Sequence, residues 1–290
     1  MRKLFYWKLK QREIKLGERT ALMGVLNVTP DSFSDGGKYA DPDRAFARAL
    51  ELEEQGADII DVGAESTRPG STRVSLAEEM RRLIPVLKRL KGQLATPISV
   101  DTYKAEVAER AIELGAEIIN DPSGLTFEPQ LARVVSNHDA GLVINHTRGR
   151  PDTWARLGPM PDPVGAIARD LDAAISRVRH VGIDKTRLVI DPGLGFGKRG
   201  EQNLQIIGRL ADLASLDLPI MVGPSRKHFL ALEDPEETRF ATAAAVTASV
   251  LGGAHIVRVH DVREMRAAAD VADEILHARA SHNVERGAPR

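Results

Sequence analysis

The chain has 290 residues, no cysteine and a formal net charge of −1 at pH 7. The near-neutral charge argues against binding to nucleic acid or to a membrane surface, and the lack of cysteine excludes disulfides, a thiolate nucleophile and a cysteine-ligated zinc site. Because no apolar segment is long enough to span a bilayer and the basic, aromatic N-terminus lacks the pattern of a signal peptide, we expect a soluble, cytoplasmic protein.

A short N-terminal hairpin and a series of strands are predicted first. Residues 1–20 contain two runs, Leu4–Lys10 and Glu13–Leu16, that we expect to pair ahead of the main fold. Short runs rich in Val, Ile and Leu then predict buried strands whose starts are roughly 20 to 45 residues apart. The eight predicted strands are Ala21–Val28, Ile59–Val62, Pro97–Asp101, Ile118–Asp121, Leu142–His146, Leu188–Asp191, Pro219–Val222 and Ile256–His260.

A helical pattern follows each predicted strand. Asp41 and Pro42 are typical of a helix start, and Gly56 of its end. Ser75 and Glu78 match a capping box ahead of the second helix. Further helices are predicted at 107–112, 131–135, 164–181, 203–213, 241–251 and from 261 to about 280, and residues 281–290 are expected to be a disordered tail.

Eight strands that alternate with helices predict an α/β protein, a (β/α)₈ TIM barrel in one domain over residues 1–290. Continuous apolar strands fit a parallel sheet that is buried on both faces. An open doubly wound sheet is the rival architecture, but it normally has fewer strands and a glycine-rich phosphate turn after the first one. This chain has Asn27-Val28-Thr29-Pro30 at that place.

Polar or charged side chains end seven of the eight predicted strands. In a barrel of this kind the strand C-termini and the loops after them build the active site. One such residue alone, Asp61, is most simply a cap of the next helix, and a surface salt-bridge network is a credible alternative for Lys198 and Arg226. Seven that converge on one mouth indicate a binding site, and they are Asn27, Asp61, Asp101, Asn120, His146, Asp191 and the pair Arg258 and His260.

One end of the predicted site suits a flat heterocycle. The loop 191–198 carries three glycines that allow close backbone approach, and its Phe196 can stack on a ring. The carboxylates of Asp101 and Asp191 can accept hydrogen bonds from an amidine-like N–H edge. We therefore infer a planar ligand that is rich in hydrogen-bond donors.

The other end of the predicted site suits phosphate. Arg68, Lys227 and Arg258, together with His260, supply cationic or donor groups, and Arg presents a planar fork to phosphate oxygens. Asn27 is a neutral oxygen ligand suited to Mg²⁺ that is held mainly by phosphates and water.

Five motifs in this order resemble the dihydropteroate synthase family of folate biosynthesis, over roughly Met23–Leu276. Members of this family are (β/α)₈ barrels and homodimers. The resemblance implies a Mg²⁺-dependent transferase that joins 7,8-dihydropterin-6-ylmethyl diphosphate to p-aminobenzoate, giving 7,8-dihydropteroate and diphosphate. The motifs that carry the resemblance are Asn27–Gly37, Glu65–Gly70, Asp191–Lys198, Ser225–Lys227 and Arg258–Asp261.

The resemblance also implies a role for each site residue. Contacts to the pterin are expected from Asp101, Asn120, Asp191, Lys227 and Arg258. Contacts to diphosphate are expected from Asn27, Thr67, Arg68, Arg258 and His260, with Asn27 also on the metal. Contacts to p-aminobenzoate are expected from Phe33, Pro69, Phe196 and Lys227.

In the mechanism that the resemblance implies, C–O cleavage runs ahead of attack by the arylamine. The pterin stabilises the methylene cation, and cations with Mg²⁺ stabilise the leaving diphosphate. Asp35 is a hypothetical contributor that steadies the cation or takes the amine proton. The residues expected to act in catalysis are Asp35, Arg68, Lys227, Arg258 and His260.

Two alternatives have a different function. Pterin-binding methyltransferases that pass a methyl group to a corrinoid share the Asp and Asn contacts but need neither phosphate cations nor an arylamine pocket. A paralogue that binds pterin without turnover would be expected to have degraded loops.

The chain departs from the family pattern at Asn145, Thr147, Leu194, Pro224, His228 and Ala241.

Overall fold

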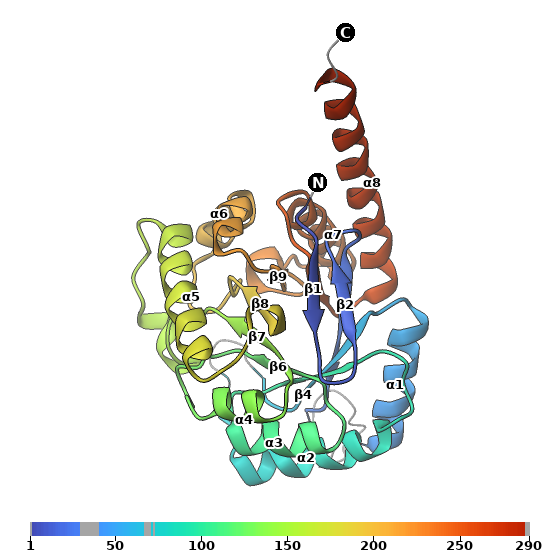
Figure 1. The fold of residues 1–290 in the computed structure, drawn as a ribbon, viewed down its shortest axis with the longest axis vertical. Coiled ribbons are helices and arrows are strands. Elements are labelled where there is room, and N and C mark those ends of the chain that lie inside the picture. The colour runs from blue at the N-terminus through green and yellow to red at the C-terminus, as the bar shows by residue number, and fades with distance from the viewer. Residues whose placement is uncertain (1, 30–40, 67–70, 72, 288–290) are drawn as a thin grey trace.

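The structure is a computed structural model that describes residues 2–29, 41–66, 71 and 73–287, with the side chains of 281–287 excepted. Eight parallel strands pair in the order β8-β7-β6-β5-β4-β3-β10-β9. A parallel bridge between Ile190 and Ile220 joins the two ends of that order, so the predicted (β/α)₈ barrel is confirmed (Figure 1). The strands are β3 (Ala21–Asn27), β4 (Ile59–Gly63), β5 (Ile98–Asp101), β6 (Ile118–Asp121), β7 (Gly141–Asn145), β8 (Leu188–Asp191), β9 (Met221–Val222) and β10 (Ile256–Val259).

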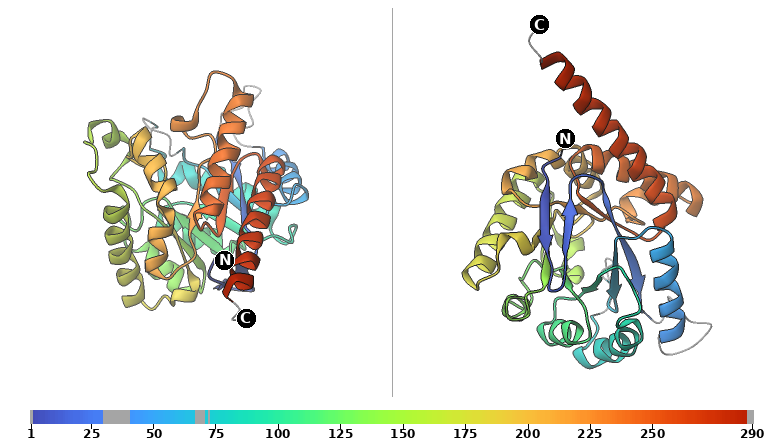
Figure 2. Two further views of the ribbon diagram at one scale, coloured as in Figure 1. Left: turned by 90° about the horizontal axis from the view of Figure 1, so that it is seen from above. Right: turned by 45° about the vertical axis from the view of Figure 1, so that its right-hand side comes forward.

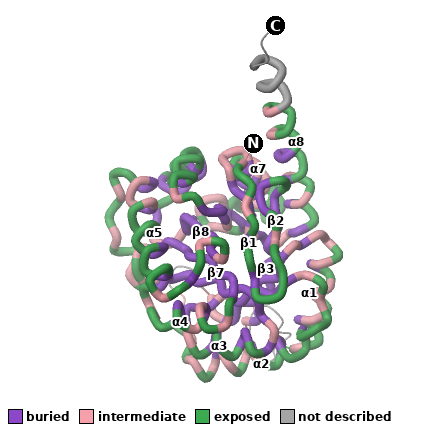
Figure 3. Tube along the Cα trace, viewed as in Figure 1, coloured by how far each residue is buried: buried purple, intermediate pink, exposed green. Residues whose placement is uncertain are grey.

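Helices surround this ring, and Figure 3 shows the buried residues concentrated in the strands and on the inner sides of the helices. The apolar stripes of the helices pack on the outward side chains of the strands in one continuous core. The helices are α1 (Pro42–Glu54), α2 (Leu76–Leu90), α3 (Ala105–Glu113), α4 (Leu131–Asn137), α5 (Pro163–His180), α6 (Gly200–Gly208), α7 (Pro235–Leu251) and α8 (Val262–Gly287). Short 3₁₀ helices are η1 (Pro151–Arg156), η2 (Lys185–Arg187), η3 (Leu210–Leu216) and η4 (His228–Leu230).

The N-terminal hairpin closes one end of the barrel. Its strands β1 (Phe5–Lys8) and β2 (Glu13–Leu16) pair in antiparallel fashion, as predicted. Trp7 is 1% exposed and packs with inward side chains at the starts of the barrel strands. Its indole Nε1 donates to the carbonyl of Arg187 at 2.9 Å. The hairpin therefore covers the N-terminal end of the barrel, opposite the C-terminal end where the predicted site residues lie.

Helix starts follow the sequence signals in part. The Asp41 side chain accepts from the backbone N–H of Asp43 at 2.9 Å, as expected for an N-cap. Ser75 likewise accepts from the N–H of Glu78 at 3.2 Å. The Glu78 carboxylate binds arginines of its own helix, including Arg82 at 2.7 Å. Within the described residues, the predicted capping box therefore shows only the hydrogen bond that the Ser75 side chain accepts.

Two helices are longer than predicted. Helix α7 begins at Pro235 because Asp234 caps it, accepting from the N–H of Glu236 at 2.7 Å. Helix α8 continues to Gly287, so the prediction of a disordered tail is wrong for 281–287. The segment before Gly287 contains no proline or glycine to stop the helix. Figures 1 and 2 show this helix extending away from the barrel. None of the described helices is long and apolar enough to cross a membrane.

Candidate active site

An arginine and two aspartates form the centre of the site at the C-terminal end of the barrel. Arg258 on β10 donates from Nε to Asp61 Oδ2 at 2.6 Å and from Nη2 to Asp101 Oδ2 at 2.8 Å. Asn120 on β6 donates from Nδ2 to the same Asp61 oxygen at 3.1 Å. Four strands thus bring their polar ends together, as the barrel topology predicts.

Asp61 is the main residue that sequence reasoning misplaced. The expectation that it caps the next helix is wrong, because that helix begins at Leu76 and its N-cap is Ser75. Asp61 is fully buried and binds Arg258 and Asn120. Its second oxygen, Oδ1, has no hydrogen-bond partner in the described part of the chain, so this oxygen can still accept a bond from a ligand or from water.

Burial sets the charge state of Asp101. Desolvation raises the pKa of its carboxyl to about 7, although Arg258 opposes the shift, and the nearby Asp61 adds to it. The carboxyl therefore takes up a proton at a higher pH than an exposed aspartate does. A protonated carboxyl can donate a hydrogen bond to a heterocycle as well as accept one from it.

Asp191 and Lys227 stand beside this centre. Asp191 is buried, its Oδ1 accepts from the N–H of Gly193 at 2.7 Å, and desolvation raises the pKa of its carboxyl. The Lys227 ammonium lies 4.4 Å from the centroid of the Phe196 ring. Desolvation and the nearby Arg258 lower the pKa of Lys227 to about 8. The charge of Asp191 raises the pKa values of both Lys227 and Arg258. Acidic and basic groups from distant segments thus lie in one cup at the C-terminal end of the barrel.

Lys198 holds the loop after β8 in place. It is 7% exposed, and its Nζ donates to the carbonyls of His146 at 2.8 Å and Gly193 at 2.7 Å. The alternative of a surface salt bridge therefore does not hold for Lys198, and burial lowers its pKa well below the usual value. Gly193 has φ +69°, and a Cβ there would lie 2.0 Å from the His146 carbonyl oxygen. Only glycine fits this turn.

His146 does not face the cup that its strand-end position predicted. Its Nε2 lies 3.1 Å from Oδ2 of Asp170 on the outer helix α5, while Nδ1 has no described partner. Burial lowers the pKa of His146 to about 3, so the ring is neutral. The predicted ion pair of Arg226 does form, with Asp261 at 2.7 Å.

His260 lies at the end of β10 where phosphate is expected. Ser225 Oγ is 3.0 Å from His260 Nδ1 and also accepts from the His260 backbone N–H at 3.2 Å. This arrangement directs the Ser225 hydroxyl proton to Nδ1 and leaves the proton of the neutral ring on Nε2. Burial and the Arg258 charge lower the pKa of His260 to about 3. His260 is therefore a neutral donor and does not add to the cations.

Several predicted site residues lie outside the described residues, and their predicted roles remain predictions. They are Phe33, Asp35, Thr67, Arg68 and Pro69. Asn27, at the end of β3, is described and half-buried.

Residues 23–260 match the family of pterin binding enzymes. The chain belongs to this family. Among its relatives, the dihydropteroate synthase of Synechocystis is 43% identical over 263 residues, which cover 89% of this chain and 91% of the relative. The enzyme of that name from Bacillus subtilis is 40% identical over 277 residues, 94% of this chain and 95% of its own. This pterin-binding enzyme is thus a dihydropteroate synthase family member, and such proteins are transferases.

Solved structures agree with the family assignment. A dihydropteroate synthase from Clostridium difficile, crystallised in the presence of pteroic acid, has a TM-score of 0.84 and 43% identity, covering 90% of this chain and 98% of its own. The Xanthomonas albilineans enzyme in complex with 7,8-dihydropteroate has a TM-score of 0.80 and 37% identity, covering 90% and 96%. A Yersinia pestis enzyme with a sulfonamide drug has a TM-score of 0.87 and 35% identity, covering 94% and 100%. The pterin-binding fold is therefore shared over nearly the whole chain.

Proposed function

We propose that this chain catalyses the condensation of 7,8-dihydropterin-6-ylmethyl diphosphate with p-aminobenzoate, giving 7,8-dihydropteroate and diphosphate. The observation that carries the proposal is the buried cluster in which Arg258 binds Asp61 and Asp101, with Asp191 and Lys227 beside it. Such a cluster offers acceptors to a donor-rich heterocycle and cations to a leaving group. The relatives' names and their complexes with pteroic acid and dihydropteroate support the same substrates.

In the proposed binding step the pterin enters the acidic part of the cup. Asp101, Asn120 and Asp191 hold its polar edge, and Lys227 binds a ring acceptor. Because Arg258 donates to both Asp61 and Asp101, pterin binding replaces or shares the contact with Asp101. Asp61 then keeps Arg258 at the site.

In the proposed chemical step the C–O bond between the pterin methylene and the diphosphate breaks, and the electron pair leaves with the diphosphate. Arg258 and the Nε2–H of His260 stabilise the leaving group. The amine nitrogen of p-aminobenzoate then forms the new C–N bond and releases one proton to water. Phe196 and Lys227 form one wall of the space where the arylamine lies.

The donor set fits a Mg²⁺ ion that the substrate itself largely binds. The residues described by the structure contain no group of three or more His, Cys, Asp or Glu side chains able to hold a metal. Asn27 offers one neutral oxygen at the end of β3, which suits an ion coordinated mainly by phosphates and water. When bound, the ion would neutralise developing charge on the diphosphate.

Diphosphate release tests the proposal. We expect release that requires both substrates and stops when EDTA removes divalent metal, with activity restored by added Mg²⁺. Release that ignores p-aminobenzoate would indicate hydrolysis of the pterin diphosphate, and methyl transfer to a corrinoid would favour the methyltransferase alternative. Either result would contradict the proposed reaction.

The proposal includes a cytoplasmic homodimer. Large apolar side chains are exposed on α6, α7 and α8, which pack against one another in sequence. Phe240 on α7 is 66% exposed and Val271 on α8 is 61% exposed. Exposed apolar groups on adjacent helices are typical of a surface that a second subunit covers.

A further inference from the structure

A chain of hydrogen-bonded, largely buried side chains is built on the three residues that follow Asp101. Lys104 is 3% exposed, and its ammonium binds the carboxylates of Glu65 at 2.5 Å and Glu79. The Thr102 hydroxyl donates to the Glu79 carboxylate at 2.6 Å. The end of β5, which carries Asp101, is thus joined both to helix α2 and to the loop after β4.

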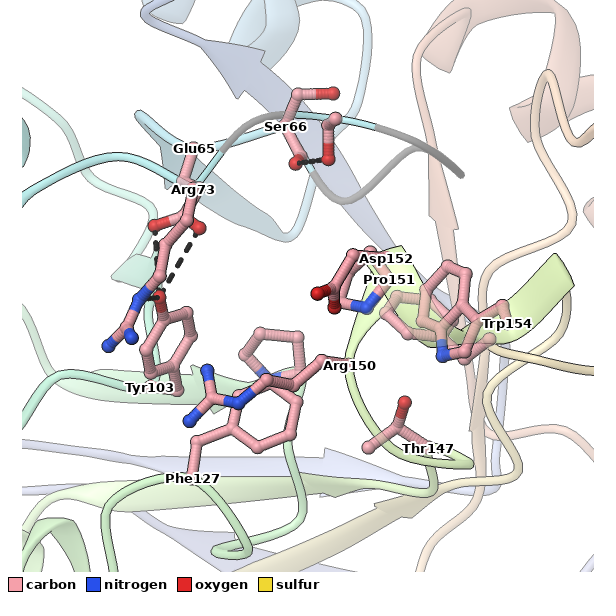
Figure 4. A pocket seen from close by; sticks show the side chains of 13 residues that line it. Glu65, Ser66, Arg73, Tyr103, Phe127, Thr147, Arg150, Pro151, Asp152 and Trp154 are labelled. Atoms are coloured by element: carbon pink, nitrogen blue, oxygen red, sulfur yellow. Dashed lines mark hydrogen bonds between the residues drawn. The ribbon is translucent and has the colours of Figure 1, made fainter. Parts of the chain in front are cut away.

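The Tyr103 hydroxyl connects the two described ends of the loop between β4 and α2 (Figure 4). It accepts from Nε of Arg73 at 2.9 Å and donates to the Glu65 carboxylate at 3.3 Å. A carboxylate offers only acceptors and a phenol has one proton to donate, so the direction of both bonds is determined. Ser71 Oγ also donates to the Ser66 carbonyl at 2.6 Å, across the same two ends. The start and the end of this loop are therefore tied to each other.

Tyr103 can be altered without disturbing the charges of the chain. Lys104 lies between Glu65 and Glu79, and its removal would leave two carboxylates without their cation, which affects folding before function. Tyr103 is 6% exposed, and its ring packs edge to face on Phe127 with centroids 5.2 Å apart. Replacement of Tyr103 by phenylalanine keeps this ring contact and removes only the hydroxyl.

The tied loop leads to the diphosphate end of the site. Thr67 and Arg68, which are predicted to contact diphosphate, come between Glu65 and Arg73 in the sequence and lie outside the described residues. The polar contacts of the pterin are instead expected from strand ends such as Asp101 on β5. Tying the two ends of a loop lowers the conformational entropy that its residues lose when they bind a ligand. Loss of the tie should therefore weaken contacts to diphosphate more than contacts to the heterocycle.

We propose that Tyr103 is a positioning residue for the diphosphate end of the site, because its hydroxyl holds together the two ends of the loop to which Thr67 and Arg68 belong. The inference rests on the proposed function, since it takes diphosphate as the ligand of this loop. The pterin end does not depend on the hydroxyl, although Asp101 is only two residues away in the sequence.

Calorimetric titration of Tyr103→Phe without turnover tests the proposal, with two separate probes. One probe is inorganic diphosphate with Mg²⁺, and the other is 6-hydroxymethyl-7,8-dihydropterin, the pterin substrate without its diphosphate. We expect diphosphate binding to weaken about tenfold, the lower end of the loss when an outer partner that orients a binding group is removed. Binding of the pterin alcohol should be unchanged.

Tyr6→Phe is the matched control, because it removes a phenol hydroxyl from a residue that is 52% exposed on the N-terminal hairpin. This variant should bind both probes as the wild type does. Equal weakening of both probes in Tyr103→Phe would show a general disturbance of the site and overturn the proposal. Unchanged diphosphate binding in Tyr103→Phe, or no diphosphate binding by the wild type, would also overturn it.

A double-mutant cycle shows whether Tyr103 acts through the loop. Tyr103→Phe should raise the KM for the pterin diphosphate in the wild-type background and have no further effect in Arg68→Gln. Factors that multiply in the double variant would show that the hydroxyl acts independently of Arg68, against the proposal. An inactive wild type whose two probes still respond to Tyr103→Phe as expected would contradict only the proposed reaction.

Discussion

Asp61 is buried without exposed surface and joins the side chains of β6 and β10 at one oxygen. In Asp61→Asn the charged partner of Arg258 Nε is lost, while Asp101 still binds Nη2. We expect the free energy of unfolding to fall by about 1.5–3 kcal/mol, the range for a hydrogen bond to a charged group. We also expect the KM for the pterin diphosphate to rise, because Arg258 is no longer fixed from two sides.

Denaturant unfolding and steady-state kinetics check this prediction. Asp43→Asn is the control, since Asp43 binds Arg89 at 2.7 Å with a side chain that is 79% exposed. Its unfolding free energy should change by less than about 0.5 kcal/mol, because water screens an exposed pair. Equal effects of the two substitutions would show that Asp61 has no special role.

The pH dependence of kcat/KM for the pterin substrate should be bell-shaped. Asp101 has a pKa of about 7, so acidification below that value protonates an acceptor that the donor edge of the ligand needs. Lys227 has a pKa of about 8, so more alkaline solution removes its charge. The rate constant should fall about tenfold per pH unit outside each limit, as for a single essential ionisation.

Substitution identifies the two limbs of this profile. Lys227→Arg should move the alkaline limb upward, because arginine stays protonated at all accessible pH values. The raised pKa of Asp101 also means that the folded state holds this proton more tightly than the unfolded chain. That contribution to stability is lost as pH rises through about 7, and Asp101→Asn should remove the loss. A flat profile of kcat/KM between pH 5.5 and 9 would contradict the assignment of its two limbs to Asp101 and Lys227.

Individual residues were predictable where the topology alone decides their place. Asp101, Asp191 and Arg258 end strands, and parallel strands in a barrel bring their ends to one mouth. The partners of Asp61 and the outward turn of His146 toward Asp170 were not predictable. Both depend on the side-chain packing between segments far apart in sequence, which strand patterns do not encode.

At the scale of elements, the loop after β8 depends on one buried lysine. Lys198→Met keeps most of the side-chain volume but leaves the carbonyls of His146 and Gly193 without their donor. We expect the free energy of unfolding to fall by about 1–3 kcal/mol. The KM for the pterin diphosphate should also rise, because the same loop positions Asp191 and Phe196.

Urea unfolding and kinetics on Lys198→Met provide the measurement, with Lys88→Met as control. Lys88 is exposed on α2 and distant from the site loop, so neither quantity should change. A stable Lys198→Met protein with wild-type KM would show that the loop is held by other contacts. Nothing in the local sequence separates this lysine from a surface lysine, because its burial follows from glycines that let the loop fold over it.

The hairpin is the second element with a clear test. Trp7→Ala should lower the unfolding free energy by about 3–5 kcal/mol, as for other buried aromatic residues. Tyr6→Ala is the control on the same strand, since Tyr6 is 52% exposed and Trp7 is 1% exposed. Below the melting temperature both variants should keep the wild-type KM values, because the site is at the other end of the barrel. A raised KM in Trp7→Ala would show coupling between the two ends.

At the scale of the whole molecule, the proposed dimer makes a specific prediction. Phe240→Glu places a charge on the exposed apolar surface of α7 and should shift the protein to a monomer. Light scattering after size-exclusion chromatography measures the mass. Leu4→Glu is the control, because Leu4 is 50% exposed on the N-terminal segment. A wild-type monomer, or a Phe240→Glu protein that stays dimeric, would place the interface elsewhere or exclude it.

The overall fold was largely predictable from sequence, because eight apolar runs and intervening helical patterns restrict the topology to few solutions. The hairpin was also predicted, but its packing against the N-terminal end of the barrel was not. The surface on which it packs is assembled from the starts of many strands. The predicted end of α8 was wrong, because polar composition near a chain end does not exclude a helix.

The contact between Trp7 and Arg187 has a consequence for synthesis on the ribosome. The hairpin emerges among the first residues, yet the carbonyl that receives its indole is made only after β7 and the following helix. The nascent chain must therefore carry an unseated tryptophan until translation has passed Arg187, during which it offers an apolar surface to chaperones or to neighbouring chains. Translation that stalls before the Arg187 codon would leave the Trp7 indole without its acceptor carbonyl.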